Sequence, residues 1–140
     1  MKYIFRLILV WGLLLIGFDG FAQSKTNVDV FTVGQGSIES AVKSSFHGYD
    51  FLSFSFRDRE AKIAKPKQAA KGMPWVWRAR FWGHEPQVDI ALLERGFHVV
   101  YCDVAELFGN AEAIGIWNDF YVHLRKMGFA KKAVLEGMSR

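Results

Sequence analysis

Residues 133–140 read AVLEGMSR, a short apolar run that leads into Gly137-Met138-Ser139-Arg140. The last four letters match the start of the pattern G-x-S-x-G, in which a serine lies on a sharp turn between a strand and a helix. Small residues beside the serine allow the strained turn to form, and the turn exposes the hydroxyl group above the sheet. The segment therefore predicts a strand at 133–136 that ends in a tight turn carrying Ser139 as a nucleophile.

The chain before this turn alternates between strand and helix patterns. An aromatic run and an alternating run flank a charged turn, and together they predict an antiparallel hairpin between residues 46 and 66. After the hairpin we expect strands at 75–81, 97–102 and 133–136, separated by helices at 87–95 and 111–127. This order predicts an α/β fold, in which an antiparallel hairpin is followed by parallel strands joined by right-handed crossover helices.

The helices carry signals at their ends and along one face. Asn110 can cap the helix expected at 111–127, and Gly96 stands where a left-handed residue would end the helix at 87–95. Spacings of three, four and three residues are typical of one helix face. We expect the apolar face of the longer helix to consist of Ile114, Trp117, Tyr121 and Leu124.

The N-terminus predicts export of the protein. Residues 1–22 have a basic start, an apolar core and small residues before a cleavage point after Ala22, which is the pattern of a secretory signal peptide. The apolar core is shorter than the roughly 20 residues that a membrane helix needs. We expect a secreted or periplasmic protein that leaves the membrane after cleavage; the alternative is an uncleaved N-terminal anchor. Residues 23–45 form a polar leader, in which we expect one short helix near 37–44.

The composition excludes several classes of protein and site. The chain has 140 residues and one cysteine, so it has no internal disulfide framework and no cysteine-rich zinc site. Its 18 basic and 14 acidic side chains are spread along the sequence, without the clustering typical of nucleic-acid binders. We expect no nucleic-acid partner, no metal and no cofactor, because the sequence contains none of the corresponding motifs.

Over residues 46–140 the chain resembles the α/β-hydrolase family, and it is most similar to the secreted bacterial hydrolases and esterases of that fold. The resemblance implies that Ser139 attacks the carbonyl carbon of a carboxylic ester or amide. It implies an oxyanion hole made by the backbone N–H of Arg140 and an N–H of Trp82 or Gly83. The loop that holds Trp82 and Gly83 lies where family members often carry His-Gly-Gly. His84, in the same loop, is expected to line the substrate pocket.

The resemblance also implies that part of the catalytic machinery lies elsewhere. In this family the acid and the histidine of the triad follow the serine along the chain. His47, His84, His98 and His123 all precede Ser139. We therefore expect residues 46–140 to be the N-terminal half of a hydrolase domain, truncated at the nucleophile turn and inactive alone. The substrate class would be a small-molecule or glycan-linked ester; the sequence does not predict the oligomeric state.

Other interpretations of these residues stay open. The protein could be a non-catalytic exported α/β module that binds carbohydrate through Trp75, Trp77 and Trp82, although alternating aromatic residues on a strand are typical of a core. His98 and Cys102 lie in an apolar strand and are expected to be buried structural residues. Asp103 follows that strand, where it could contact a ligand or cap the next turn.

Overall fold

The structure is a computed structural model, and it describes residues 31–38 and 40–139. The predicted signal peptide, the first residues of the leader and Arg140 lie outside the described residues. The elements are β1 (Phe31–Val33), β2 (Gly36–Ile38), β3 (Val42–Phe46), β4 (Tyr49–Phe56), β5 (Arg59–Lys65), β6 (Trp75–Arg78), α1 (Gln87–Glu94), β7 (His98–Cys102), α2 (Ala111–Lys126) and β8 (Val134–Glu136). No helix in this part of the chain is long and apolar enough to cross a membrane.

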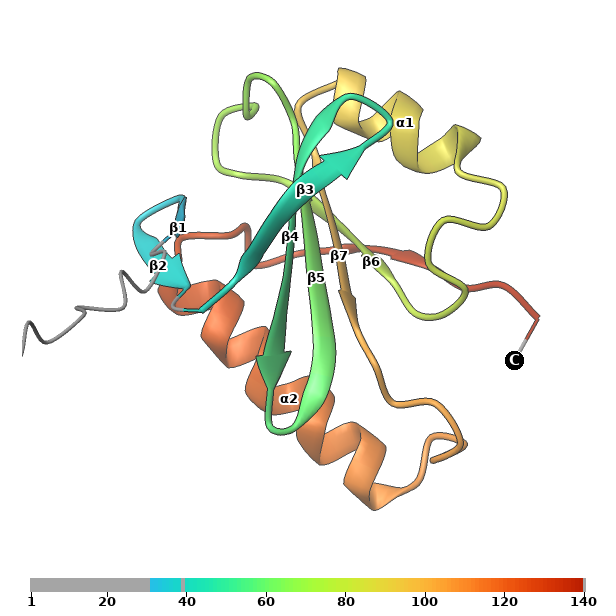
Figure 1. Cartoon of the computed structure of the whole chain (residues 1–140). Helices are drawn as coiled ribbons and strands as arrows, with labels where there is room; N and C mark the ends of the chain where they lie inside the picture. Colours follow the sequence, from blue (N-terminus) through green and yellow to red (C-terminus); the bar gives the residue numbers. More distant parts are fainter. Residues whose placement is uncertain (1–30, 39, 140) are drawn as a thin grey trace, which may run out of the picture.

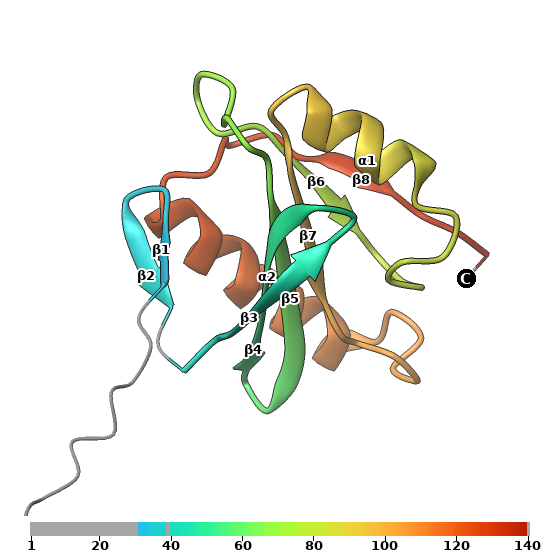
Figure 2. The ribbon, with the colours of Figure 1, turned by 45° about the horizontal axis from the view of Figure 1, so that its top comes forward.

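Six strands form one sheet in the order β3-β4-β5-β7-β6-β8, and β1 pairs with β2 in a separate hairpin. The strands from β3 to β7 in this order pair antiparallel, whereas β6 pairs parallel to both β7 and β8. Figure 2 shows β8 at the outer edge of the sheet, beside β6. Only the part of the sheet around β6 is therefore parallel.

The predicted fold class is wrong. The sheet is mixed and mostly antiparallel, and the described residues contain only two helices, so this is not an α/β fold built on crossover helices. One source of the error is the segment at 23–45. Its described part forms β1, β2 and β3 instead of a helix near 37–44. Four of the five side chains of β3 are exposed, so this edge strand lacks the apolar alternation that predicts a strand.

The two helices cover opposite faces of the sheet. Neighbouring side chains on a strand point to opposite faces, and Val99 and Val100 of β7 belong to different apolar clusters. Val100 packs in a cluster with residues of α2, and Val99 packs in a cluster with Leu93 of α1. Figures 1 and 2 show α2 running along one side of the sheet and α1 on the other. Both helices therefore lie where they can position the loops at the ends of β6 and β7.

The buried face of α2 differs from the predicted one. Ile114 is 47% exposed, while Trp117 and Tyr121 are half-buried. These two side chains keep their polar groups bonded, because the Trp117 indole donates to the Cys102 carbonyl and the Tyr121 hydroxyl donates to the Lys131 carbonyl. The prediction passed over small Ala113, which starts the stripe that the helix buries. That stripe consists of Ala113, Ile116, Phe120 and Leu124.

Two predicted helix signals are confirmed. The Asn110 side chain accepts a hydrogen bond from the backbone N–H of Ala113 at 2.9 Å, as a capping residue does. Gly96 follows α1 with a φ of +84°, and a Cβ there would lie 2.6 Å from the backbone nitrogen of Ala70. Both the left-handed backbone and the close approach therefore require glycine at this position.

Replacing Asn110 by alanine is expected to lower the free energy of unfolding by about 1 kcal/mol, because the N–H of Ala113 loses its acceptor. Asn118, which is exposed in the middle of α2, gives a matched control, and Asn118→Ala should have a smaller effect. The measurement is the midpoint of urea-induced unfolding at constant slope. Equal midpoints for the two variants would show that the cap contributes nothing.

Candidate functional site

The strands β6, β7 and β8 run in the same direction, so their carboxyl ends meet at one edge of the sheet. The residues that follow them are Ala79, Asp103 and Gly137. The N–H of Ala79 donates to the carbonyl of Glu136 at 2.9 Å, so the segments after β6 and β8 begin side by side. In open α/β sheets ligands bind beyond the carboxyl ends of parallel strands, and β6, β7 and β8 form the parallel part of this mixed sheet. This edge is therefore the candidate functional site.

Two cavities lie at this edge, one of about 370 Å³ and one of about 280 Å³. Ala79 and Trp117 line both of them. The larger cavity continues over the residues after β7, including Asp103 and Phe108, and the smaller one reaches Gly137. Most of the larger cavity's lining is apolar, with Arg80 and Asp103 as its charged residues. It is large enough for a small organic group.

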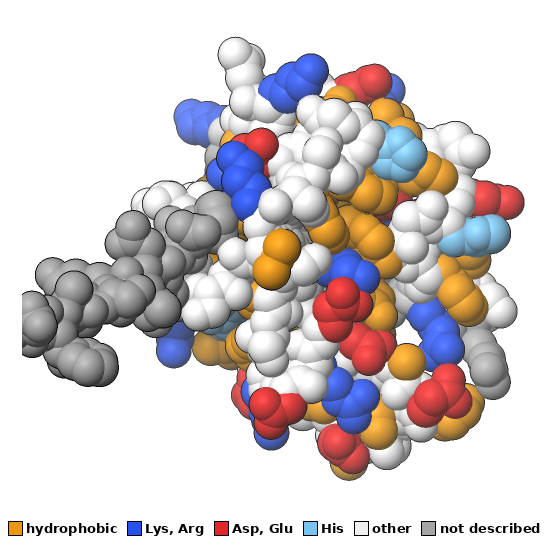
Figure 3. All heavy atoms as spheres, in the orientation of Figure 1, with side chains coloured by type: hydrophobic (Ala, Val, Ile, Leu, Met, Phe, Trp, Pro, Cys, Tyr) orange, Lys and Arg blue, Asp and Glu red, His pale blue; other side chains and the backbone are white. Residues whose placement is uncertain are grey.

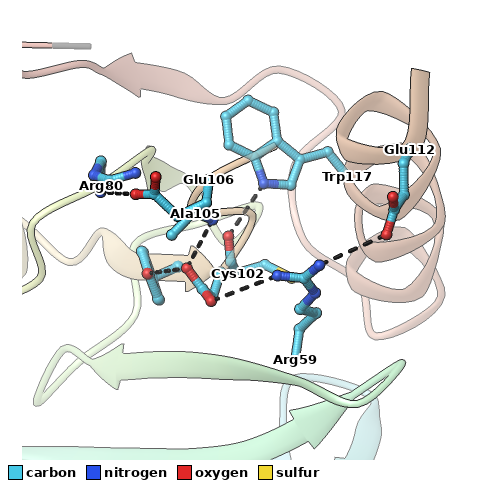
Figure 4. Close-up of polar contacts among 9 residues, drawn as sticks. Arg59, Arg80, Cys102, Ala105, Glu106, Glu112 and Trp117 are labelled. Carbon is cyan, nitrogen blue, oxygen red and sulfur yellow. Dashed lines mark hydrogen bonds and ion pairs between the residues drawn. The ribbon is translucent and has the colours of Figure 1, made fainter. Parts of the chain in front are cut away.

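Asp103 is held in place by hydrogen bonds on the wall of the larger cavity. One of its oxygens accepts from the Tyr101 hydroxyl at 2.9 Å and from the backbone N–H of Ala105 at 3.0 Å. Its other oxygen lies 4.0 Å from Arg59, which also contacts Glu112 (Figure 4). The predicted turn-capping role of Asp103 is confirmed by the bond to Ala105. Burial, then the bond to Asp103, raises the pKa of Tyr101 above its ordinary value.

Trp117 and Arg80 line the same cavity as Asp103, and each makes a polar contact of its own (Figure 4). The Trp117 indole donates to the carbonyl of Cys102 at 3.1 Å, which fixes the ring against the end of β7. Arg80 pairs with Glu106 at 3.1 Å. Cys102 itself is fully buried, as predicted, and burial raises the pKa of its thiol to about 12. Because only the thiolate is a good nucleophile, Cys102 is not a candidate for catalysis.

Ser139 lies three residues beyond the end of β8 and is exposed. Its φ is +63°, in the left-handed region that residues other than glycine seldom adopt. Such a conformation costs about 1–2 kcal/mol, and nine other non-glycine residues of the described chain, including Ser40, also have a positive φ. No hydrogen bond holds its hydroxyl group within residues 31–38 and 40–139. The side chain is therefore free to approach a ligand.

The loop between β6 and α1 contains the predicted oxyanion donors Trp82 and Gly83. Phe81, Gly83 and Glu85 in this loop all have positive φ angles. The ring of Trp82 packs at 5.1 Å from Phe46, over the face of the sheet that α1 covers. The backbone N–H groups of Trp82 and Gly83 donate to no backbone carbonyl in the described part of the chain. Both groups are thus available to a ligand.

His84 and Arg140 complete the set of predicted site residues. His84 is exposed, its N–H donates to the Phe81 carbonyl, and its ring lies 6.5 Å from that of Phe81. It is not among the residues that line the two cavities. Arg140 lies outside the described residues. The structure thus brings the start of the loop beside the end of β8, while His84 stays at the outside of the loop.

The other histidines lie in separate places. His98 is buried, as predicted, and burial lowers its pKa to about 4. Burial also lowers the pKa of His123, which lies on α2. His47 is in the turn after β3, with its ring against Phe46. In the described ranges no hydrogen bond joins a histidine to Ser139.

Sequence reasoning missed a buried ionic cluster next to this site. Arg78, at the end of β6, is 1% exposed, and its guanidinium lies 2.6 Å from Asp89 of α1 and 2.9 Å from Glu136 of β8. Burial first, and then the neighbouring Glu136 carboxyl, raise the pKa of Asp89 to about 7. An arginine at the end of the apolar run WVWR was the available signal, but its partners are 11 and 58 residues away.

Charged side chains are mixed on the visible surface. On the face shown in Figure 3, acidic and basic side chains lie next to one another. Arg57 pairs with Asp119 at 2.6 Å and Arg59 with Glu112 at 3.6 Å. Within the described residues no group of three or more His, Cys, Asp or Glu side chains could hold a metal ion.

Comparisons with protein-family models, with curated proteins and with solved structures found no match to this chain.

Proposed function

We propose that this chain supplies the nucleophile Ser139 of a serine hydrolase that acts on a carboxylic ester or amide. One observation carries the proposal: an exposed serine with a φ of +63° follows β8 at the edge where the parallel strands end. In hydrolases that carry the pattern G-x-S-x-G, the serine lies on a sharp turn after a strand, which presents its hydroxyl above the sheet.

In the proposed reaction the oxygen of Ser139 attacks the carbonyl carbon of the substrate. The serine loses its proton to a general base, and the electron pair of the carbonyl moves onto its oxygen. Collapse of this intermediate expels the alcohol or amine, which takes the proton, and water then releases the acid from the acyl-serine. We propose that the histidine and the acid belong to chain beyond residue 140, and that residues 1–140 alone are inactive.

The oxyanion would be held by backbone N–H groups. Those of Trp82 and Gly83 support this role, because they have no backbone acceptor among the described residues and their loop begins beside Glu136. The N–H of Arg140 would be the other donor, as the residue after the nucleophile provides one in this class of turn. Preorganised donors of this kind stabilise charge only where the oxyanion forms.

The larger cavity supports a small apolar group on the substrate. Its volume of about 370 Å³ lies near the lower end of the range for ligand pockets. Val104, Phe108 and Trp117 provide apolar lining, and Arg80 lies at the same cavity. We propose a small-molecule or glycan-linked ester with a short acyl or aromatic group as the substrate, hydrolysed after export through the predicted signal peptide.

The carbohydrate-binding alternative finds no support in the tryptophans. Trp75 is fully buried, and Trp77 packs at 5.2 Å from Trp117. Trp82 stacks on Phe51 at 5.4 Å. Sugar-stacking platforms need exposed aromatic faces, whereas these rings pack on other rings. We therefore propose only the hydrolase function.

The test is covalent labelling of the protein expressed from its complete gene, including any codons after 140. A fluorophosphonate probe should form an adduct, and trypsin should release it on the peptide AVLEGMSR, between Lys132 and the bond after Arg140. The Ser139→Ala variant should not be labelled. Labelling of a different serine, or none in the folded protein, would refute the assignment of Ser139.

A further inference from the structure

Arg78 contacts three segments that meet at the candidate site. Its guanidinium pairs with Asp89 of α1 and with Glu136 of β8. Its Nε donates to the Phe81 carbonyl at 3.1 Å, and its Nη2 donates to the His84 carbonyl. These two carbonyls lie on either side of Trp82 and Gly83 in the sequence. One buried side chain thus joins the loop, the helix and the strand that precedes Ser139.

We propose that Arg78 is a positioning residue, which, together with Glu136, fixes the backbone N–H of Trp82 relative to the segment that carries Ser139. The inference rests on the proposed function and deepens it.

The geometry of the peptide group carries the first step. The carbonyl of Phe81 and the N–H of Trp82 belong to the same peptide unit, and the two groups of a trans peptide point in opposite directions. No cis peptide bond occurs in the described residues. When Arg78 holds the Phe81 carbonyl toward itself, it turns the Trp82 N–H away from the buried cluster. The guanidinium, together with the His84 N–H that donates to the same carbonyl, therefore fixes where this candidate oxyanion donor points.

The second step concerns the backbone of the loop. Phe81 and Glu85 have φ angles of +51° and +46°, which are unfavourable for side chains of their size. Such conformations persist only when surrounding contacts hold them. The Arg78 hydrogen bonds to Phe81 and His84 are the side-chain contacts that reach the loop backbone in the described part of the chain.

The third step links the loop to the nucleophile. Glu136 is the last residue of β8, and its side chain binds Arg78 while its carbonyl accepts from Ala79. Ser139 follows three residues later. The guanidinium is a planar fork with five donors, so it can hold the carboxylates and the loop carbonyls in one fixed arrangement. A lysine carries the same charge but lacks this fork.

The first test measures the loop directly and needs no activity. In the protein from the complete gene, Arg78→Lys is expected to speed chymotryptic cleavage after Phe81 or Trp82 about tenfold under native conditions, because the loop opens more often. Val100→Ala removes apolar atoms from a buried position on the other face of the sheet and serves as a control for general destabilisation. The two variants are compared under conditions in which their urea midpoints are equal. If chymotrypsin then cleaves the loop equally fast in both, the inference is overturned.

The second test measures the site. Arg78→Lys is expected to lower kcat for an ester about tenfold or more with KM unchanged, as for loss of an interaction made in the transition state. Val100→Ala should leave kcat unchanged at a temperature where both variants are folded. Glu136→Gln is a milder variant for the case that Arg78→Lys does not fold, and it should lower kcat without exposing the loop to protease.

The outcomes separate the two proposals. If the wild-type protein carries no adduct on Ser139, the proposed function fails, while the protease test still reports on the loop. If Ser139 is labelled and both Arg78→Lys and Glu136→Gln keep the wild-type kcat, the positioning role of Arg78 is refuted and the hydrolase function stands.

Discussion

Replacing Ser139 by alanine is expected to lower kcat/KM for ester hydrolysis by about 10³-fold or more in the protein expressed from its complete gene. The change removes the atom that forms the acyl-serine, so only the oxyanion donors and substrate binding would still contribute. KM should change little, because the cavity at Ala79 and Trp117 does not include the serine. The measurement is steady-state hydrolysis of a chromogenic ester with a short acyl chain, at enzyme concentrations that reveal weak residual activity.

Ser40 offers a matched control for this substitution. It is an exposed serine with a φ of +57°, in the turn between β2 and β3, far along the chain from the candidate site. Ser40→Ala makes the same chemical change on the same type of backbone, and its kcat/KM should equal that of the wild type. If Ser139→Ala retains more than about a tenth of the activity, another group is the nucleophile, since triad serines contribute far more.

Most elements were predictable because their signals are local. The strand β7 consists entirely of buried residues and reads as an apolar, β-branched run. Asn110 marks the start of α2 because its side chain caps the helix, and Gly96 marks the end of α1 because it adopts a left-handed backbone. The strand β8 was predictable for the same reason, because its signal spans only a few consecutive residues.

The pairing of the strands was not predictable from these signals. Antiparallel pairing of β5 with β7 joins segments separated by the loop after Lys65, β6 and α1, and nothing in either strand specifies its partner. The edge strand β3 buries only Phe46, so its sequence looks like a polar leader. The error in fold class follows from both causes, because β3 carries no apolar alternation and the antiparallel pairing of β5 with β7 has no local signal.

The Arg78 cluster was hidden for a related reason. A charged side chain at the end of a strand normally predicts a solvated end, and only the three-dimensional arrangement shows that Asp89 and Glu136 meet it in the interior. Ser139 remains a prediction from the sequence, whereas the residue proposed to position its oxyanion donor could be found only in the structure.

Replacing Arg78 by methionine is expected to lower the free energy of unfolding by about 3–5 kcal/mol at pH 8, because it leaves two carboxyl groups in the interior without their cation. Asp89 is fully buried, and one oxygen of Asp89 and one of Glu136 are buried without a hydrogen-bond partner in the described residues. The measurement is urea-induced unfolding of the variant and the wild type in the same buffers at pH 5 and pH 8.

The loss should be smaller at pH 5 than at pH 8. Burial raises the pKa of Asp89 in the folded protein to about 7, above the value of about 3.9 for an unfolded chain. The folded state therefore binds this proton more tightly, and the associated stability is present below pH 4 and is lost as the pH rises through 7. The Arg78 charge lowers the pKa of Asp89. Without this charge, ionisation of Asp89 costs more free energy, so the variant loses more stability as the pH rises toward 8.

Arg57 supplies the control for this pH dependence. It pairs with Asp119 at 2.6 Å, but both side chains are more than half exposed. Arg57→Met should cost at most about 1 kcal/mol, and equally at both pH values, because exposed pairs are solvated and screened. His98 titrates in every variant, so its contribution cancels in the differences. If Arg78→Met costs the same at pH 5 as at pH 8, Asp89 does not hold a proton in the cluster, and Arg78 then pairs with a permanently ionised carboxylate.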